Sequence, residues 1–279
     1  MRTSFADRPI VAGTDGTAHA ALAVEWAADE AHRRGLPLRV VHAADRLPYD
    51  TPRYPIPDCY DRMIPSGRQV LDHAEKVARD RWPGLEVTTE LADGRPGRVL
   101  REQARRAAEL VLGGHGPVGG RLAGHVDVPV VVVRPASPGA GAEIVAGFDG
   151  SHAATPALAY AFEEARLSGH RLRVVCAWEP PISSGPRIAV DTGEIGRIRE
   201  DQARRLLTAW RDRFADVETE LDMVRAHPVA ALVDASARAA LLVVGSHGRN
   251  ALTAAVLGSV SRAMLEHARC PVAVVRHAA

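Results

Sequence analysis

Apolar residues along this chain alternate between two patterns. Short runs of valine, leucine and isoleucine are separated by longer stretches in which apolar residues recur at helical spacing. The short runs predict buried β-strands, and the longer stretches predict amphipathic helices. In the first half, the predicted strands are 9–13, 38–43, 85–91, 109–113 and 129–134, and the predicted helices are 18–34, 67–81 and 97–107.

The second half shows the same succession. Its predicted strands are 143–147, 171–177, 217–225, 241–245 and 271–276, and its predicted helices are 152–168, 195–214, 228–239 and 259–268. Thr17 and Ser151 stand where the first helix of each half would take an N-cap. Gly35 and Gly169 stand where those helices would end. Each half is therefore expected to begin with a strand and a capped helix.

The chain is an internal repeat. IVAGTDGTAHAAL from Ile10 matches IVAGFDGSHAATP from Ile144, and LRVVHA from Leu38 matches LRVVCA from Leu172, both displaced by 134 residues. Further on, LVLGGHG matches LVVGSHG at a displacement of 132, and PVVVVR matches PVAVVR at 142. The first half therefore lacks ten residues between its GHG and its last strand.

This repeat predicts the fold class. Near-continuous apolar strands that alternate with helices favour a parallel sheet covered on both faces, because right-handed crossovers place the helices there. We expect an α/β protein of two tandem, doubly wound, Rossmann-like domains. The N-terminal domain is placed at 1–136 and the C-terminal domain at 143–279, joined by a linker at 137–142 in the Pro/Gly-rich stretch RPASPGAGA.

Composition narrows the class of protein. The 279 residues are 46% apolar and 25% charged, which is typical of a globular protein, and the net charge is +1. So small a net charge gives no basis for a nucleic-acid or membrane partner. Three cysteines are too few for a disulfide framework, and the amino terminus lacks the apolar run of a secretory signal. We expect a cytoplasmic protein.

Candidate ligand contacts lie just after the predicted strands of the second half. In open parallel sheets, ligands bind beyond the carboxyl ends of the strands. Three places qualify there: 147–150, Ala177 with the residue after it, and 245–259. Gly245 and Gly248 lack a Cβ, so their backbone N–H groups can turn toward one anion.

The start of the last predicted helix adds a second anion-binding feature. Gly258 and Ser259 open that helix, where unpaired N–H groups and the helix dipole favour negative charge. The nine residues between Gly248 and Gly258 would form a loop that brings helix and turn onto the same phosphates. Turn and cap geometry without a ligand is the alternative explanation of these glycines.

The stretch 245–259 has the pattern GxxG, then nine residues, then GS, and it lies between a predicted strand and a predicted helix. This pattern resembles the ATP-binding motif of the universal stress proteins. Asp149 after the first strand, the ending CPVAVVR and the tandem arrangement also resemble that family, so the resemblance covers nearly the whole chain. It implies the family's Rossmann-like fold, which is similar to that of the adenine nucleotide alpha hydrolases.

The resemblance also implies roles for single residues. Asp149 would approach the adenosine, although a turn residue beside a helix is its alternative interpretation, and the backbone of Ala177 would bond adenine. The phosphates would be surrounded by Gly245, Gly248, Gly258, Ser259 and Val260. Gly147, Phe148 and Val244 complete the implied set. Bound ATP would bring Mg²⁺ with its phosphates, while the histidines form no ligand set for a protein-bound metal.

The first half keeps only part of this set: Gly13, Thr14, Asp15, Gly113 and Gly116. The ten missing residues remove the spaced Gly-Ser. Gly124 is followed by His125, and only four residues separate Gly124 from Pro129, so we expect no final helix of ordinary length there. The first half is therefore predicted to bind ATP weakly or not at all and to pair with the second half.

Other motifs carry less weight. GHGPVG, from Gly114, matches GxGxxG but follows the fourth strand rather than the first, so we interpret it as coincidence. No GxxxxGK[ST] or GxSxG sequence occurs, and no catalytic residue is assigned. The Pro/Tyr-rich stretch 47–65 is either a flexible lid or partner loop or a disordered connector.

The sequence thus predicts an ATP-binding universal stress protein that acts as a nucleotide-dependent stress-response regulator through a protein partner it does not identify. Two alternatives stay open. One is a slow ATPase or phosphotransferase that uses Ser259 or His247. The other is a nucleotide-free module whose last strands, 129–134 and 271–276, join the halves edge to edge, and the family resemblance leaves a homodimer open as well.

Overall fold

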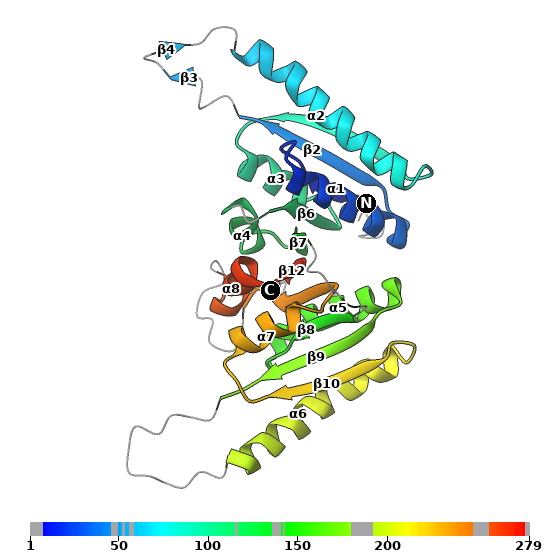
Figure 1. Cartoon of the computed structure of the whole chain (residues 1–279), viewed down its shortest axis with the longest axis vertical. Coiled ribbons are helices and arrows are strands. Elements are labelled where there is room, and N and C mark those ends of the chain that lie inside the picture. The colour runs from blue at the N-terminus through cyan, green and yellow to red at the C-terminus, as the bar shows by residue number, and fades with distance from the viewer. Residues whose placement is uncertain are drawn as a thin grey trace.

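The computed structural model describes most of the chain in two halves that share one sheet (Figure 1). The described residues are 8–45, 50–51, 54–55, 59–114, 117–135, 141, 143–179, 192–247 and 257–276. The strands of the shared sheet are β1 (Ile10–Gly13), β2 (Leu38–Ala44), β5 (Val87–Asp93), β6 (Glu109–Gly113), β7 (Val130–Val133), β8 (Glu143–Gly147), β9 (Arg171–Ala177), β10 (Thr219–Val224), β11 (Leu241–Gly245) and β12 (Val272–Val275). A separate antiparallel pair is formed by β3 (Asp50–Thr51) and β4 (Tyr54–Pro55).

The ten strands follow the order β10-β9-β8-β11-β12-β7-β6-β1-β2-β5. Within each half the pairing is parallel. Numbered within its own half, each set of five strands runs 3-2-1-4-5, so the strand order reverses between β1 and β6 and again between β8 and β11. These reversals are the switch points at which doubly wound sheets bind ligands.

The two halves join through their last strands. β7 and β12 pair antiparallel, with Val131 opposite Ala273, and both residues are fully buried. The expected edge-to-edge pairing of these strands within one chain is confirmed. It also covers an edge that each half would otherwise expose.

Helices cover both faces of the sheet. The α-helices are α1 (Ala18–Arg34), α2 (Cys59–Arg81), α3 (Pro96–Ala104), α4 (Pro117–Ala123), α5 (Thr155–Ser168), α6 (Thr192–Arg213), α7 (Pro228–Ser236) and α8 (Ser259–His267), and a 3₁₀ turn, η2 (His152–Ala154), precedes α5. The buried side chains of α1, α2, α5 and α6 share one apolar cluster, while those of α3, α4, α7 and α8 share the other. The expected doubly wound α/β fold is therefore confirmed.

Most of the predicted elements agree with the structure, and the differences are local. Thr17 caps α1 by accepting a hydrogen bond from the Ala20 amide, and α1 ends at Gly35 in the left-handed region. Ser151 differs from the prediction, because it precedes η2 and makes no side-chain capping bond. α2 begins at Cys59, so its first turns occupy part of the stretch 47–65 that was expected to be a loop.

The last helix of the first half is short. The missing ten residues were expected to leave no room for a final helix of ordinary length, and the helix found there, α4, has seven residues. It fits because it begins at Pro117, the residue directly after the GHG.

Candidate functional site

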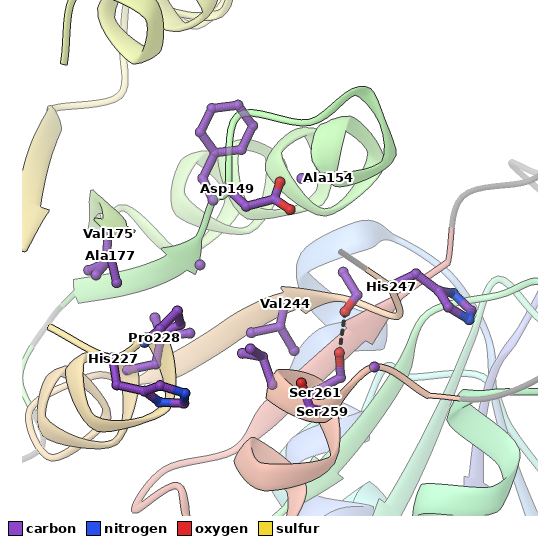
Figure 2. Close-up of a pocket in the computed structure, with 16 residues that line it drawn as sticks. Asp149, Ala154, Val175, Ala177, His227, Pro228, Val244, His247, Ser259 and Ser261 are labelled. Atoms are coloured by element: carbon purple, nitrogen blue, oxygen red, sulfur yellow. Dashed lines mark hydrogen bonds between the residues drawn. The ribbon is translucent and has the colours of Figure 1, made fainter. Parts of the chain in front are cut away.

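A cavity of about 420 Å³ opens at the switch point of the second half, beyond the carboxyl ends of β8 and β11 (Figure 2). Its lining residues are Gly147, Phe148, Asp149, Ala154, Val175, Ala177, His227, Pro228, Leu232, Val244, Gly245, His247, Gly258, Ser259, Val260 and Ser261. Every site residue predicted in the second half is among them except Gly248, which lies outside the described residues. Segments as distant as 147 and 260 are thus brought to one place.

The two ends of the cavity differ in chemistry. Figure 2 shows Val175, Ala177 and Pro228 toward one end and Ser259, on the first turn of α8, toward the other. The first end is largely apolar, and Leu232 from α7 adds to it. The second end presents mainly backbone and hydroxyl groups, so the cavity suits a ligand with an apolar part and a polar part.

The N-terminus of α8 is the polar end. Gly258 is the N-cap, and no side chain caps the helix. The first intrahelical bond runs from the Arg262 amide to the Gly258 carbonyl, so the amides of Ser259, Val260 and Ser261 have no intrahelical acceptor. The described residues offer them no capping side chain. These amides, with the positive end of the helix dipole, form an anion-binding arrangement.

Two hydrogen bonds hold this helix start against β11. The Gly258 amide donates to the Ser246 carbonyl at 2.9 Å, and the Ser261 hydroxyl donates to the Gly245 carbonyl at 2.6 Å, the dashed bond in Figure 2. Ser261 is only 3% exposed, so its bond is shielded from water. The distance between strand end and helix start is therefore fixed from both sides.

We expect Ser261→Ala to lower the affinity for an anionic ligand of this cavity by about fivefold, the effect of losing one buried hydrogen bond of about 1 kcal/mol. The serine hydroxyl points at Gly245, so the loss acts through the position of α8. Calorimetric titration with ATP, beside thermal unfolding of both proteins, measures the effect. An affinity equal to that of the wild type would show that α8 is held without this bond.

Asp149 lines the cavity and has a structural partner as well. Its Oδ1 accepts a hydrogen bond from the Ser151 amide at 2.9 Å, and Gly150 between them has a φ of 76°. The carboxylate is therefore both a turn residue, as the alternative interpretation held, and a cavity-lining group.

His247 was named from the sequence only for the ATPase alternative, and these further lining residues were not found from the sequence: Ala154, Val175, His227, Pro228, Leu232 and Ser261. Pro228 gives a signal that could have located part of this set. It occupies the first turn of α7, directly after β10, and His227 caps that helix by accepting from the Val229 amide. A proline at this position marks a helix start, and helix starts after strands lie at the ligand-binding edge.

The corresponding place in the first half is packed. A Cβ on Gly13 would lie 2.7 Å from the Leu112 side chain and 3.0 Å from that of Leu100. A Cβ on Gly113 would lie 2.2 Å from the His19 carbonyl oxygen of α1. Both glycines are thus explained by close packing, and Gly116 lies outside the described residues.

Asp15 and Thr14 of the first half also have partners within the fold. The Thr17 amide and hydroxyl both donate to Asp15 Oδ1. Partial burial acts to raise the pKa of Asp15, but these hydrogen bonds outweigh it and lower that pKa below its ordinary value. The Thr14 hydroxyl accepts from the Gly16 amide. These residues shape the turn into α1.

Strand order 3-2-1-4-5 in both halves and an anion-binding helix start at one switch point define a tandem, doubly wound α/β protein with a candidate nucleotide-type cavity. The model of the Universal stress protein family matches residues 8–134 and 142–276. The chain belongs to the universal stress protein family.

Full-length relatives support this assignment. A universal stress protein of Mycobacterium tuberculosis (strain H37Rv) is 33% identical over 287 residues, covering 96% of each chain. One from Mycolicibacterium smegmatis is 31% identical over 306 residues, covering 99% of each. The crystal structure of a universal stress protein from Archaeoglobus fulgidus aligns over 97% of this chain and 98% of that one, with a TM-score of 0.70 and 16% identity, which shows a common fold.

No helix among the described residues is both long enough and apolar enough to cross a bilayer.

Proposed function

We propose that the second half of the chain, 143–279, binds one molecule of ATP and that the protein acts as a nucleotide-dependent regulator in the stress response. The observation that carries this proposal is the uncapped start of α8, whose amides lie at one end of a cavity with an apolar opposite end. A triphosphate and an adenine ring require these two environments.

The two ends of the cavity divide the nucleotide between them. The backbone at Ala177, beside Val175 and Leu232, offers adenine an apolar slot with peptide groups at its edge. The amides of Ser259 and Val260 would donate to phosphate oxygens, where the helix dipole adds to their effect. The volume of about 420 Å³ lies in the range of roughly 300–1,000 Å³ usual for small-molecule sites. Mg²⁺ would enter with the phosphates, which supply its preferred oxygen ligands.

ATP is proposed here as a ligand that selects a conformation of the protein. Among the described residues, the acid and base side chains that line the cavity are Asp149, His227 and His247. Asp149 Oδ1 accepts from the Ser151 amide, His227 Nδ1 from the Val229 amide, and His247 Nδ1 pairs with the Ser246 hydroxyl. Each carries a structural bond, so this arrangement favours binding over fast hydrolysis.

The proposal is tested by identifying and counting the bound nucleotide. We expect mass spectrometry of the supernatant from denatured protein to find intact ATP, and equilibrium dialysis to give one equivalent per chain. Two equivalents would contradict the assignment of the first half. No uptake at millimolar ATP would leave a pairing module without a nucleotide, and steady release of phosphate would identify a slow ATPase.

A further inference from the structure

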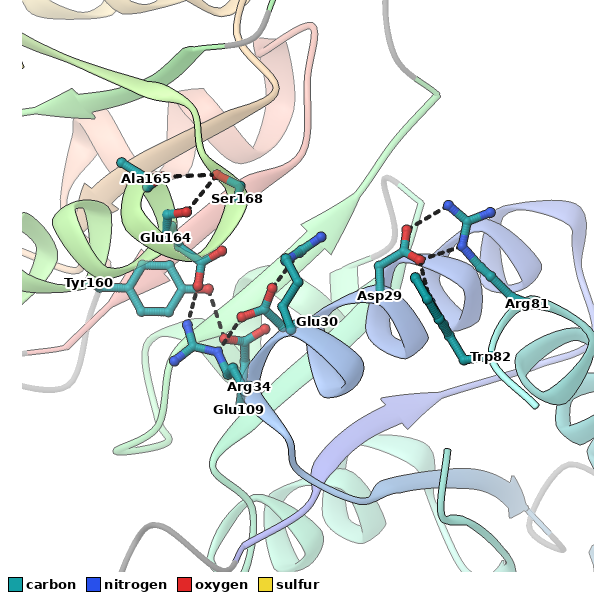
Figure 3. Close-up of polar contacts among 11 residues, drawn as sticks. Asp29, Glu30, Arg34, Arg81, Trp82, Glu109, Tyr160, Glu164, Ala165 and Ser168 are labelled. Carbon is teal, nitrogen blue, oxygen red and sulfur yellow. Dashed lines mark hydrogen bonds and ion pairs between the residues drawn. The ribbon is translucent and has the colours of Figure 1, made fainter. Parts of the chain in front are cut away.

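Three buried glutamates meet where the two halves touch (Figure 3). Glu30 comes from α1, Glu109 from the start of β6 and Glu164 from α5, and none is more than 2% exposed. Glu30 and Glu164 are the same position of the repeat, since they are displaced by 134 residues. One carboxylate oxygen of each residue lies within 4.8 Å of those of the other two. The cluster therefore lies on the contact between equivalent helices.

Two arginines from α1 supply the positive charge. Arg34 bonds Glu30 on its own helix and Glu164 across the contact, and Arg33 bonds Glu30 as well. Three ionised carboxylates against two guanidinium groups would leave one uncompensated negative charge. The strands on either side of β6, which are β1 and β7, carry no titratable residue. In a buried place, such a charge is costly unless it is neutralised.

Glu109 is where the neutralising partner is missing. The Tyr160 hydroxyl of α5 donates to its Oε2 at 2.7 Å, whereas its buried Oε1 has no hydrogen-bond partner among the described residues. As a carboxylate oxygen, Oε1 would face two other carboxyl groups with no donor. A proton on Oε1 would turn that atom into a donor and remove the uncompensated negative charge of the cluster.

We propose that Glu30, Glu109 and Glu164 together bind one proton at neutral pH, and that its release destabilises the joined state of the two halves. In that step the O–H bond of one carboxyl group breaks, the proton passes to solvent, and a third buried carboxylate is left behind. A divalent cation is a poorer occupant, because Arg33 and Arg34 would be its direct neighbours and already bond oxygens of Glu30 and Glu164.

The titration of the cluster agrees with this geometry. Burial, together with the neighbouring Glu30, raises the pKa of Glu109 to about 8. Burial and Glu30 also raise the pKa of Glu164. Burial acts to raise the pKa of Glu30 too, but Arg34, a hydrogen bond with Glu164 and Arg33 together outweigh burial and lower that pKa. These three groups titrate as one unit, so the proton belongs to the cluster.

The sign of the effect on stability follows from linkage. The folded chain keeps the proton up to about pH 8, whereas an unfolded glutamate loses it near its ordinary value of about 4.3. The stabilisation is therefore complete below about pH 4.3 and is lost as the pH rises toward 8. One proton corresponds to about a tenfold rise in the unfolding constant per pH unit across that window.

The test compares denaturant unfolding of the wild type and Glu109→Gln at pH 5, 6, 7 and 8. Glutamine keeps the shape of the protonated acid and cannot ionise. We expect the ratio of the wild-type to the variant unfolding constant to rise by about tenfold per pH unit. Glu163→Gln, at the neighbouring position on α5, removes a partly exposed carboxylate paired with Arg166 and should parallel the wild type.

A variant on the other half checks that the contact senses the proton. The hydrogen bond from Tyr160 favours the ionised form of Glu109 and so lowers its pKa. Tyr160→Phe should therefore raise that pKa, and the pH at which the stability stops falling should rise with it. Parallel curves for the wild type and Glu109→Gln would overturn the proposal. Stabilisation of the wild type but not of Glu109→Gln by millimolar MgCl₂ or MnCl₂ at pH 7 would also overturn it, in favour of a metal site.

Infrared spectroscopy of the wild type provides a test that needs no variant to fold. We expect the carbonyl stretch of a protonated carboxyl group at pH 7, with loss of that band as the pH is raised to 9. A spectrum at pH 7 with ionised carboxylates alone would overturn the proposal.

Discussion

Gly258→Asp is expected to abolish ATP binding while the protein stays as stable as the wild type or becomes slightly more stable. Gly258 is the N-cap of α8, and its φ of −60° and ψ of 157° are open to any residue. A Cβ there would have its nearest neighbour, the Ser246 carbonyl oxygen, at 3.4 Å, which is ordinary contact. Aspartate is among the best N-cap residues and stabilises a helix by about 1 kcal/mol relative to a residue that cannot cap.

The same carboxylate occupies the place proposed for the phosphates. The carboxylate would accept hydrogen bonds from the amides of the first turn of α8, which are then no longer open to phosphate. It would also place a negative charge against the triphosphate, and like charges that face each other cost several kcal/mol of binding free energy. We expect the affinity for ATP to fall by roughly a hundredfold or more, about 3 kcal/mol. Calorimetric titration and thermal unfolding of the same preparations measure the two effects.

Gly258→Asn is the matched control, because asparagine has the shape and capping ability of aspartate without the charge. It should lose less affinity than Gly258→Asp and show that charge is the main cause. An affinity of Gly258→Asp within a few-fold of the wild type would place the phosphates elsewhere and refute the role given to α8.

Gly113→Ala is expected to destabilise the fold by about 3 kcal/mol or more, whereas Gly245→Ala, at the same position of the repeat, should cost about 1 kcal/mol or less. A Cβ on Gly113 would lie 2.2 Å from the His19 carbonyl oxygen and 2.7 Å from the Ala20 amide nitrogen. Both are backbone atoms of α1, so the whole helix would have to move. A Cβ on Gly245 would have its nearest neighbour, the His247 carbonyl oxygen, at 3.2 Å.

The comparison is made by denaturant unfolding of the two variants under identical conditions. Both substitutions change glycine to alanine at equivalent strand ends. The difference between their losses of unfolding free energy therefore reports the difference in local packing. Equal losses of stability would mean that the two switch points are packed alike. That result would remove the physical distinction between an open second half and a closed first half.

The two halves differ in structure at their switch points. In the second half, thirteen residues separate β11 from α8, which begins at Ser259 after the N-cap Gly258. In the first half, the loop is missing, α4 begins at Pro117, and Leu100 and Leu112 close on Gly13. The shared sheet holds both halves through β7 and β12, so the closed half serves as the structural partner of the open one.

Sequence alone determined the repeat, the succession of strands and helices, and the edge of the sheet at which the cavity lies. These features are local or periodic: apolar runs predict burial, Gly35 and Gly169 mark helix ends, and Gly258 marks the start of α8. The displacement of 134 residues showed which positions of the two halves are equivalent. Most elements of the fold and part of the cavity lining could therefore be predicted from the sequence.

Tertiary structure decided what depends on neighbours far apart in the chain. The close packing of Gly113 comes from α1, and α8 is held against β11 by the bond from Ser261 to Gly245. The short α4 packs on β7, where Gly119 lies against Val132. Glu30, Glu109 and Glu164 look like ordinary charged residues in the sequence. Only the contact between the halves buries them together, because burial and proximity arise when the chain folds back on itself, and no local pattern records them.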